Sequence, residues 1–206
     1  MKLLTEADLR ALCLPAGFAL PLPAGTVLTP AARDYCAERG ITVCTEKPEH
    51  MTQLRGELLV PKTHPSIKLR GKLDSLEALL LQGIAQAREL GREQCAAGLQ
   101  DCFNLAQAIM AAEVKEQALP SWSLLGLDSA ALRHASHNPR DWAGIPYPTP
   151  HAGMSALCLA LNFLRTQVRE CERAACEALA HRTDMIEALN RMSSAVYLLF
   201  LKELVG

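Results

Sequence analysis

The chain has 206 residues, of which 50% are hydrophobic and only 4% aromatic, and its formal net charge is −1. This balance excludes the strongly basic surface of a nucleic-acid-binding protein, and the few aromatic side chains disfavour a β-sandwich. No apolar run reaches the roughly 18 residues of a membrane-spanning helix, and the first ten residues become acidic too early for a secretory signal. We therefore expect a cytoplasmic protein with neither nucleic acid nor membrane as a partner.

Residues 1–45 are predicted to form a separate small α/β module. Thr29 and Pro30 have the residue types of a helix N-cap and first helical position. The predicted elements are, in order, a short helix from Thr5, an extended stretch over 20–28, a helix over 30–39 and a strand over 41–44. Residues 46–73 contain three prolines and show no clear periodicity, so we expect them to be irregular.

Apolar residues recur at helical spacing through most of the second predicted domain, residues 46–206. Asp74 and Glu77 resemble a capping box. Residues 192–201 are apolar nearly all round, which places the last helix centrally in a bundle. The helices are predicted over 74–90, 95–114, 127–134, 153–180 and 184–204, with a proline-rich loop over 138–150. The fold class is therefore all-α, a four- or five-helix antiparallel bundle with a small N-terminal α/β appendage.

Three arginines, Arg165, Arg169 and Arg173, lie four residues apart on the polar face of the predicted helix 153–180. Like charges at this spacing repel each other, and Arg165 has no acidic residue three or four positions away. Forked guanidinium donors in such a row suit a multivalent anion such as a polyphosphate. The alternative is a solvated polar face whose Arg165 pairs with another helix.

The segments around these arginines resemble a known family. The sequence LRTQVRECER at 164–173, followed by ALNRMSSAVY at 188–197, resembles the signature of cobalamin adenosyltransferases, above all their ethanolamine-utilisation (EutT) branch, a relative of the PduO type. The likeness continues upstream in residues 59–65, 69–75 and 132–139. It therefore covers most of the chain.

The resemblance implies transfer of the 5′-deoxyadenosyl group of ATP to the cobalt of cob(I)alamin, with triphosphate as the leaving group. The reduced metal is the nucleophile, which agrees with the lack of a convincing Ser–His–Asp or Cys–His arrangement in the sequence. The resemblance also implies a homo-oligomer, a trimer in preference to a dimer, with ATP between subunits and Mg²⁺ bridging its phosphates. A bacterial microcompartment or the ethanolamine-lyase system is the implied partner and location.

By the same resemblance, Arg165, Arg169 and Arg173 are catalytic residues. A departing triphosphate develops negative charge, and fixed cationic donors lower the barrier to its departure. Glu172 matches the carboxylate that orients one of these arginines.

Other matched positions are assigned to ATP. Lys62, Thr63 and Lys72 lie in the segment corresponding to the family's ATP loop, although the chain has no Walker motif. Asp74 matches an aspartate that the family places opposite an arginine of the long helix. Its alternative role is that of a helix N-cap. Arg70, in the same region, is expected to face solvent.

A further group is expected beside the nucleotide or the corrinoid. Asn190 and Arg191 match the last-helix motif, whereas Ser194 departs from the PduO type, which has an aspartate there. Trp142 and Tyr147 belong to a loop that we expect to close over the corrinoid. The alternative is a surface loop that Trp142 staples to the core.

No dedicated transition-metal site is predicted. The ethanolamine branch often carries a cysteine-rich motif ahead of the bundle, and the chain lacks it. His134 and His137 are three residues apart and are candidate ligands, but we expect them to cap, pack or line the corrinoid pocket. These departures leave an alternative function open, a non-catalytic corrinoid carrier or microcompartment cargo adaptor, and residues 1–45 are a candidate docking segment.

Overall fold

The computed structural model describes residues 2–22, 25–44, 48–56 and 58–205. They belong to two compact units, residues 1–68 and 69–206, and each is described by itself. The boundary predicted after residue 45 falls inside the first unit, because residues of the strand pair that follows contribute to that unit's core.

The first unit is a small α/β module. Its elements are β1 (Lys2–Leu4), α1 (Glu6–Ala11), β2 (Ala19–Pro21), β3 (Thr26–Leu28), α2 (Pro30–Glu38), β4 (Thr42–Cys44), β5 (Met51–Arg55) and β6 (Leu58–Pro61). Strands β1 and β3 pair in parallel, as do β2 and β4, whereas β5 and β6 form an antiparallel hairpin. Thr29 caps α2 with Pro30 at its start, as predicted. Helix α1 begins at a capping box formed by Thr5 and Asp8.

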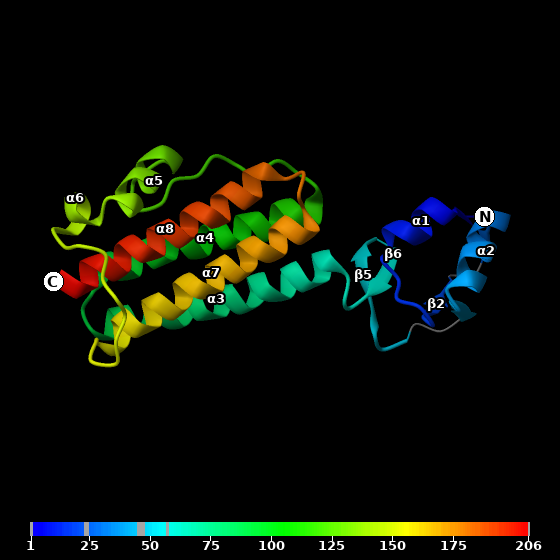
Figure 1. Cartoon of the computed structure of the whole chain (residues 1–206), viewed down its shortest axis with the longest axis horizontal. Coiled ribbons are helices and arrows are strands. Elements are labelled where there is room, and N and C mark those ends of the chain that lie inside the picture. The colour runs from blue at the N-terminus through cyan, green and yellow to red at the C-terminus, as the bar shows by residue number, and fades with distance from the viewer. Residues whose placement is uncertain (1, 23–24, 45–47, 57, 206) are drawn as a thin grey trace. The chain divides into compact units, whose positions relative to one another are not determined.

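The second unit is the predicted helical bundle (Figure 1). Its helices are α3 (Pro65–Glu89, whose first residues belong to the first unit), α4 (Glu93–Lys115), α5 (Ser129–His137), α6 (Pro139–Ala143), α7 (Ala156–Ala178) and α8 (Thr183–Val205). Short turns join α3 to α4 and α7 to α8, which makes the neighbours antiparallel. Helix α8 packs against α7, α4, α5 and α6 and buries the apolar stretch 192–201 almost completely, so its central place is confirmed. Among the described residues, no helix has both the length and the hydropathy to cross a membrane.

The prediction that residues 46–73 are irregular is wrong. They contain the β5–β6 hairpin and the first turns of α3, which begins at Pro65. The imidazole Nδ1 of His64 accepts the backbone N–H of Ser66, 3.2 Å away, at the start of this helix. Asp74 therefore lies well inside α3 and is not an N-cap. The helix extends this far because one apolar stripe is fully buried along it, Leu69, Leu73, Leu76 and Leu80.

The expectation that Arg70 faces solvent is also wrong. Its Nε lies 2.6 Å from Oε2 of Glu113, whose side chain is completely buried, so this ion pair joins α3 to α4. A second ion pair fastens the turn between α7 and α8, where Arg182 Nη2 lies 2.7 Å from Asp184 Oδ2. Hydrogen bonding to Arg182 lowers the pKa of Asp184 to about 2, and the backbone N–H of Leu119 donates to the same carboxylate.

Candidate functional site

Two of the three arginines in the predicted stripe line one pocket. Arg165 and Arg169 project from α7 into a cavity of about 450 Å³, which is also lined by residues of α5, α8 and the loop before α7. Helix α8 contributes Ser194 and Tyr197 to the lining, and α5 contributes Ser136. Segments distant in sequence are thus brought around a pair of cations.

This cation pair is not neutralised. No carboxylate lines the described part of the pocket, and neither Arg165 nor Arg169 has an acidic partner within ion-pair distance among the residues that the structure covers. Arg165 Nη2 donates a hydrogen bond to Asn162 Oδ1 at 3.2 Å. Burial lowers the pKa of Arg165, and the neighbouring charge of Arg169 lowers it further. The pocket therefore has a concentrated positive potential suited to a polyanion.

Arg173 does not line this pocket. Its Nη1 lies 3.2 Å from Glu170 Oε1, and its side chain is 80% exposed. Lys72 of α3 reaches the same carboxylate, with Nζ 3.4 Å from Oε2. Close by, the thiol of Cys171 donates to the backbone carbonyl of Lys72 at 3.3 Å. The predicted stripe is therefore divided into a cation pair at the pocket and a surface charge group between α3 and α7.

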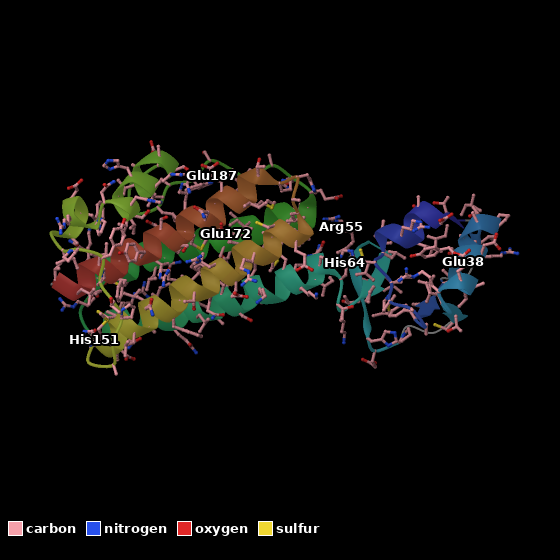
Figure 2. The ribbon with its side chains drawn as sticks, viewed as in Figure 1. Glu38, Arg55, His64, His151, Glu172 and Glu187 are labelled. Carbon is pink, nitrogen blue, oxygen red and sulfur yellow. The ribbon has the colours of Figure 1, made fainter. Side chains whose placement is uncertain are left out.

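Glu172, Asn190 and Arg191 form a polar network with Ser129, the first residue of α5. Asn190 Nδ2 donates to Glu172 Oε1 at 2.8 Å, and Arg191 donates to the Asn190 side chain. Arg191 Nε also lies 3.0 Å from both the carbonyl and the hydroxyl oxygen of Ser129, whose hydroxyl contacts Glu187. Figure 2 labels the two carboxylates of this network, on α7 and α8. These side chains contact one another and not the described pocket lining, so their contact with nucleotide or corrinoid stays a prediction.

Ser194 stands beside the cation pair, where the resemblance leads one to expect an aspartate. Its hydroxyl accepts a hydrogen bond from Ser136 Oγ at 3.2 Å. Because Ser194 lines the pocket together with Arg165 and Arg169, a hydroxyl occupies the position from which a carboxylate would offset their charge.

The structure separates the two aromatic residues that the sequence assigned to one corrinoid-covering loop. Tyr147 lines the arginine pocket, is 63% exposed, and donates from its hydroxyl to the carbonyl of His137 at 2.6 Å. Trp142 lines a different pocket together with His134 and packs against the bundle core. Lys202 Nζ lies 4.9 Å from the centre of the Trp142 ring. These contacts of Trp142 favour the staple alternative.

His134 and His137 therefore face different pockets, although they are three residues apart on α5. In the part of the chain that the structure describes, no three His, Cys, Asp or Glu side chains come together as metal ligands.

The residues assigned to ATP lie on both units. Lys62 and Thr63 are exposed in the turn between β6 and α3, in the first unit. Lys72 and Asp74 are exposed on α3, in the second unit. Burial raises the pKa of Glu77, and the charge of Asp74 one turn away raises it further. Contact of these four residues with ATP stays a prediction.

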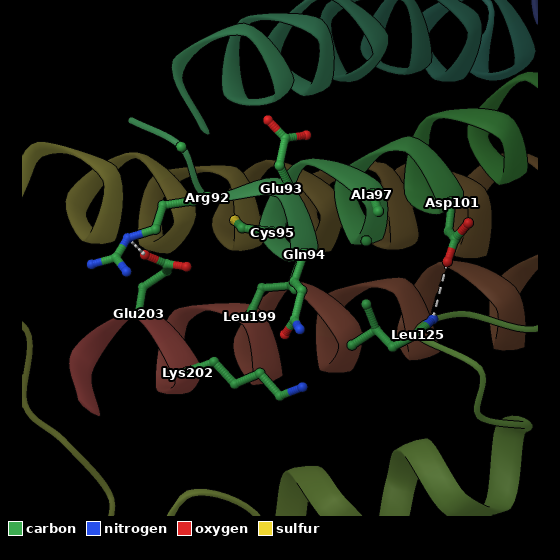
Figure 3. Close-up of a pocket in the computed structure, with 12 residues that line it drawn as sticks. Arg92, Glu93, Gln94, Cys95, Ala97, Asp101, Leu125, Leu199, Lys202 and Glu203 are labelled. Atoms are coloured by element: carbon green, nitrogen blue, oxygen red, sulfur yellow. Dashed lines mark hydrogen bonds and ion pairs between the residues drawn. The ribbon is translucent and has the colours of Figure 1, made fainter. Parts of the chain in front are cut away.

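A larger pocket, of about 640 Å³, lies between α4, α8 and the segment before α5, and none of the predicted site residues lines it (Figure 3). Its charged groups contact other groups of the protein: Arg92 Nε lies 3.3 Å from Glu203 Oε2, and Asp101 accepts the backbone N–H of Leu125 at 3.3 Å. Because acidic as well as basic side chains line it, this pocket is a poorer site for a polyanion than the arginine pocket.

Sequence reasoning did not identify Asn162, Ser136 or Tyr197 as site residues. Asn162 could have been found, because it lies one helical turn before Arg165 on the same face. Tyr197 lies one helical turn after Ser194, in a segment already singled out. Ser136 lies in the segment 132–139 noted for its resemblance, but its place at the arginine pocket depends on how α5 packs against α8.

Comparisons with known proteins agree with the resemblance noted in the sequence. The family model described as cobalamin adenosyltransferase matches residues 42–203. The corrinoid adenosyltransferase EutT of Salmonella typhimurium is 30% identical over 172 residues, an alignment that covers 81% of this chain and 63% of that protein. The chain thus spans less than two thirds of that relative. The corrinoid adenosyltransferase EutT of Escherichia coli K12 is 28% identical over 246 residues, covering 96% of this chain and 91% of the relative. No solved structure matches the chain at a significant level.

Proposed function

The chain belongs to the cobalamin adenosyltransferase family, and from that premise we propose that it transfers the 5′-deoxyadenosyl group of ATP to the reduced cobalt of a corrinoid, in support of ethanolamine utilisation. The observation that carries the proposal is the pair Arg165 and Arg169, two guanidinium groups that line a pocket without a carboxylate partner among the described residues. The relatives' names, corrinoid adenosyltransferase EutT, support the same activity. Nothing in the comparisons favours the non-catalytic alternative.

The proposed reaction is a nucleophilic displacement at C5′ of ATP. The cobalt(I) centre of the corrinoid, as substrate, supplies the electron pair that forms the Co–C5′ bond. The C5′–O5′ bond breaks, and its electrons leave on the oxygen of the departing triphosphate. No proton has to move in this step, so the chain needs no general base. Its task is to hold the reactants together and to stabilise the charge that develops on the leaving group.

Arg165 and Arg169 suit this task. Their donors are fixed on a long helix, and the part-buried position of Arg165 strengthens its interaction with an anion relative to bulk water. Glu172 acts indirectly in this proposal, by holding Asn190 between α7 and α8. Arg173, which is bound to Glu170, would reach the triphosphate only after leaving that carboxylate.

We place Mg²⁺ with the nucleotide. Mg²⁺ is usually held by one or two carboxylates together with substrate phosphates and water. No carboxylate lines the described pocket, and the oxygen-bearing side chains that line it, which are those of serines, tyrosines and Asn162, are neutral. The residues fit an ion that is bound chiefly by the phosphates of ATP.

The remaining assignments extend the proposal to other parts of the chain. Lys62, Thr63 and Lys72 are proposed to bind ATP, and the exposed Asp74 to meet an arginine of a second subunit in a homo-oligomer, a trimer in preference to a dimer. Tyr147 is proposed to face the corrinoid beside the arginine pocket. The N-terminal module is proposed to dock the enzyme to a microcompartment or a partner enzyme.

One assay tests the activity. The protein is incubated with ATP, Mg²⁺ and chemically reduced cobalamin, and the corrin absorption spectrum is followed as the Co–C bond forms. An adenosyltransferase changes the spectrum with turnover and releases one triphosphate, or its hydrolysis products, per corrinoid. A carrier would bind the corrinoid and consume no ATP, and that result would refute the proposal.

A further inference from the structure

Arg165 differs from the other half-buried arginines of the bundle. Of the described arginines in residues 69–206 that are partly buried, three have a carboxylate within 4.0 Å: Arg70 with Glu113, Arg182 with Asp184, and Arg191 with Glu187. Arg165 instead has the amide oxygen of Asn162 at 3.2 Å. The fold thus gives this half-buried cation a neutral partner.

A neutral partner has a different physical effect from a carboxylate. The Asn162 oxygen accepts one guanidinium N–H and so restricts the direction of the side chain, but it carries no net charge. The positive charge of Arg165 therefore remains available to a ligand. Ser136 and Ser194 also line the pocket without adding charge, and their hydroxyl groups hydrogen-bond to each other.

The charge of Arg165, unpaired among the described residues, destabilises the folded protein when no ligand is bound. Arg165 and Arg169 are one helical turn apart and repel each other, and burial together with this repulsion lowers the pKa of Arg165. An anion that binds both guanidinium groups removes the repulsion. Binding should therefore stabilise the folded chain, and it should weaken as salt screens the charges.

We propose that Asn162 is a positioning residue, which aims Arg165 into the pocket without neutralising it, and that Asn162, Ser136 and Ser194 together make the pocket a binding site for a free polyphosphate anion. The proposal rests on the proposed function only in assigning the leaving triphosphate to this pocket. It adds that a polyphosphate binds there without its adenosyl group, without corrinoid and without a protein-held metal ion.

Inorganic tripolyphosphate is the probe, with the full chain, at low ionic strength and in EDTA. Isothermal titration calorimetry gives the dissociation constant, and thermal unfolding reports the stabilisation. Asn162→Ala should weaken binding about tenfold, the size expected for a lost hydrogen bond to a charged group. Asn162→Asp should weaken it by about 30-fold or more, because the new carboxylate pairs with Arg165 and repels the anion.

The matched control is Asn104→Asp. Asn104 is an exposed asparagine on α4 whose Oδ1 accepts a hydrogen bond from Gln100 Nε2 at 3.0 Å, and it does not line the pocket. This substitution adds the same negative charge to the bundle, so it should change the dissociation constant by no more than about twofold. A loss as large as that of Asn162→Asp would overturn the proposal, because net charge alone would then explain it.

A double-mutant cycle separates positioning from a general structural effect. In an Arg165→Gln background, Asn162→Asp should cause little additional loss of tripolyphosphate binding, since the guanidinium on which Asn162 acts is gone. Additive losses would overturn the positioning role. An Asn162→Asp variant that binds like the wild type would also overturn it, and would leave adenosyl transfer untouched as a proposal. Failure of the activity itself would appear separately, as a wild type that binds tripolyphosphate but does not alkylate cobalamin.

Discussion

Replacing Arg169 by Ala separates a role in binding the leaving group from a role in folding. The side chain is exposed, lines the arginine pocket and has no ion pair within the described chain. Its removal relieves a like-charge repulsion with Arg165 of roughly 0.2–0.5 kcal/mol, and Ala is a better helix former. For a chain of this size, such a gain raises the unfolding temperature by about 1 °C. Removing one preorganised donor to a developing charge should instead lower kcat by about 10²–10³-fold.

The measurement pairs two readouts on the same protein. The rate of corrin spectral change at saturating ATP gives kcat, and thermal unfolding gives stability, with Arg88→Ala as the control. Arg88 is an exposed arginine in the last turn of α3 and does not line the pocket. The reasoning is refuted if Arg169→Ala keeps kcat within about threefold of wild type, or if activity is lost together with a fall of about 10 °C or more in unfolding temperature.

Three more substitutions test other parts of the bundle. Glu113→Ala removes the carboxylate that pairs with Arg70, whose side chain is only 16% exposed. The free energy of unfolding in chemical denaturation should fall by about 3–5 kcal/mol. A loss below about 1 kcal/mol would contradict a stabilising role for the buried ion pair. Arg182 lowers the pKa of Asp184 to about 2, so the carboxylate stabilises the fold above the ordinary aspartate pKa and loses that effect as pH falls toward 2. The difference in unfolding free energy between wild type and Asp184→Asn should therefore grow with pH between about 2 and 4. It should level off near 1 kcal/mol, since the Asp184 side chain is 40% exposed and its charge is screened by solvent. A difference independent of pH would contradict the lowered pKa of Asp184. Trp142→Phe removes a buried indole N–H that has no hydrogen-bond partner among the described residues. The variant should keep the unfolding temperature and the KM for corrinoid unchanged, whereas a raised KM would place Trp142 at the corrinoid site.

The helices were predictable where apolar residues recur at helical spacing over a long stretch of the chain. Helices α4, α7 and α8 each begin and end within three residues of the predicted bounds, because their apolar stripes are long and regular. The start of α3 was missed for a local reason. Pro65 and the lysine- and arginine-rich residues after it resemble a loop, yet a buried leucine already recurs there at helical spacing, beginning at Leu69.

The sequence was enough to predict which arginines lie together at the site, but not which residues the arginines of the bundle contact. Helical spacing placed Arg165 and Arg169 on one face, and the lack of acidic residues near Arg165 in sequence predicted its uncompensated charge. The partner of Arg70 was not predictable in this way, because Glu113 lies 43 residues away on another helix. The resemblance marked the segment 132–139, but residues of α5 reach the pocket only through tertiary packing, so no helical spacing placed Ser136 beside the arginines.

The three arginines form one pattern in the sequence but have different contacts in the structure, because a carboxylate of the described chain pairs with only one of them. Glu170 lies within reach of Arg173 and engages it at the surface. Glu172 is three residues from Arg169 and has the right spacing to pair with it, but Asn190 on α8 occupies that carboxylate. Arg169 is thereby left beside Arg165 at the pocket. A single hydrogen bond between α7 and α8 thus helps to keep the cation pair available to an anion, so Asn190→Ala should release Glu172 toward Arg169 and weaken tripolyphosphate binding without any change in the pocket lining.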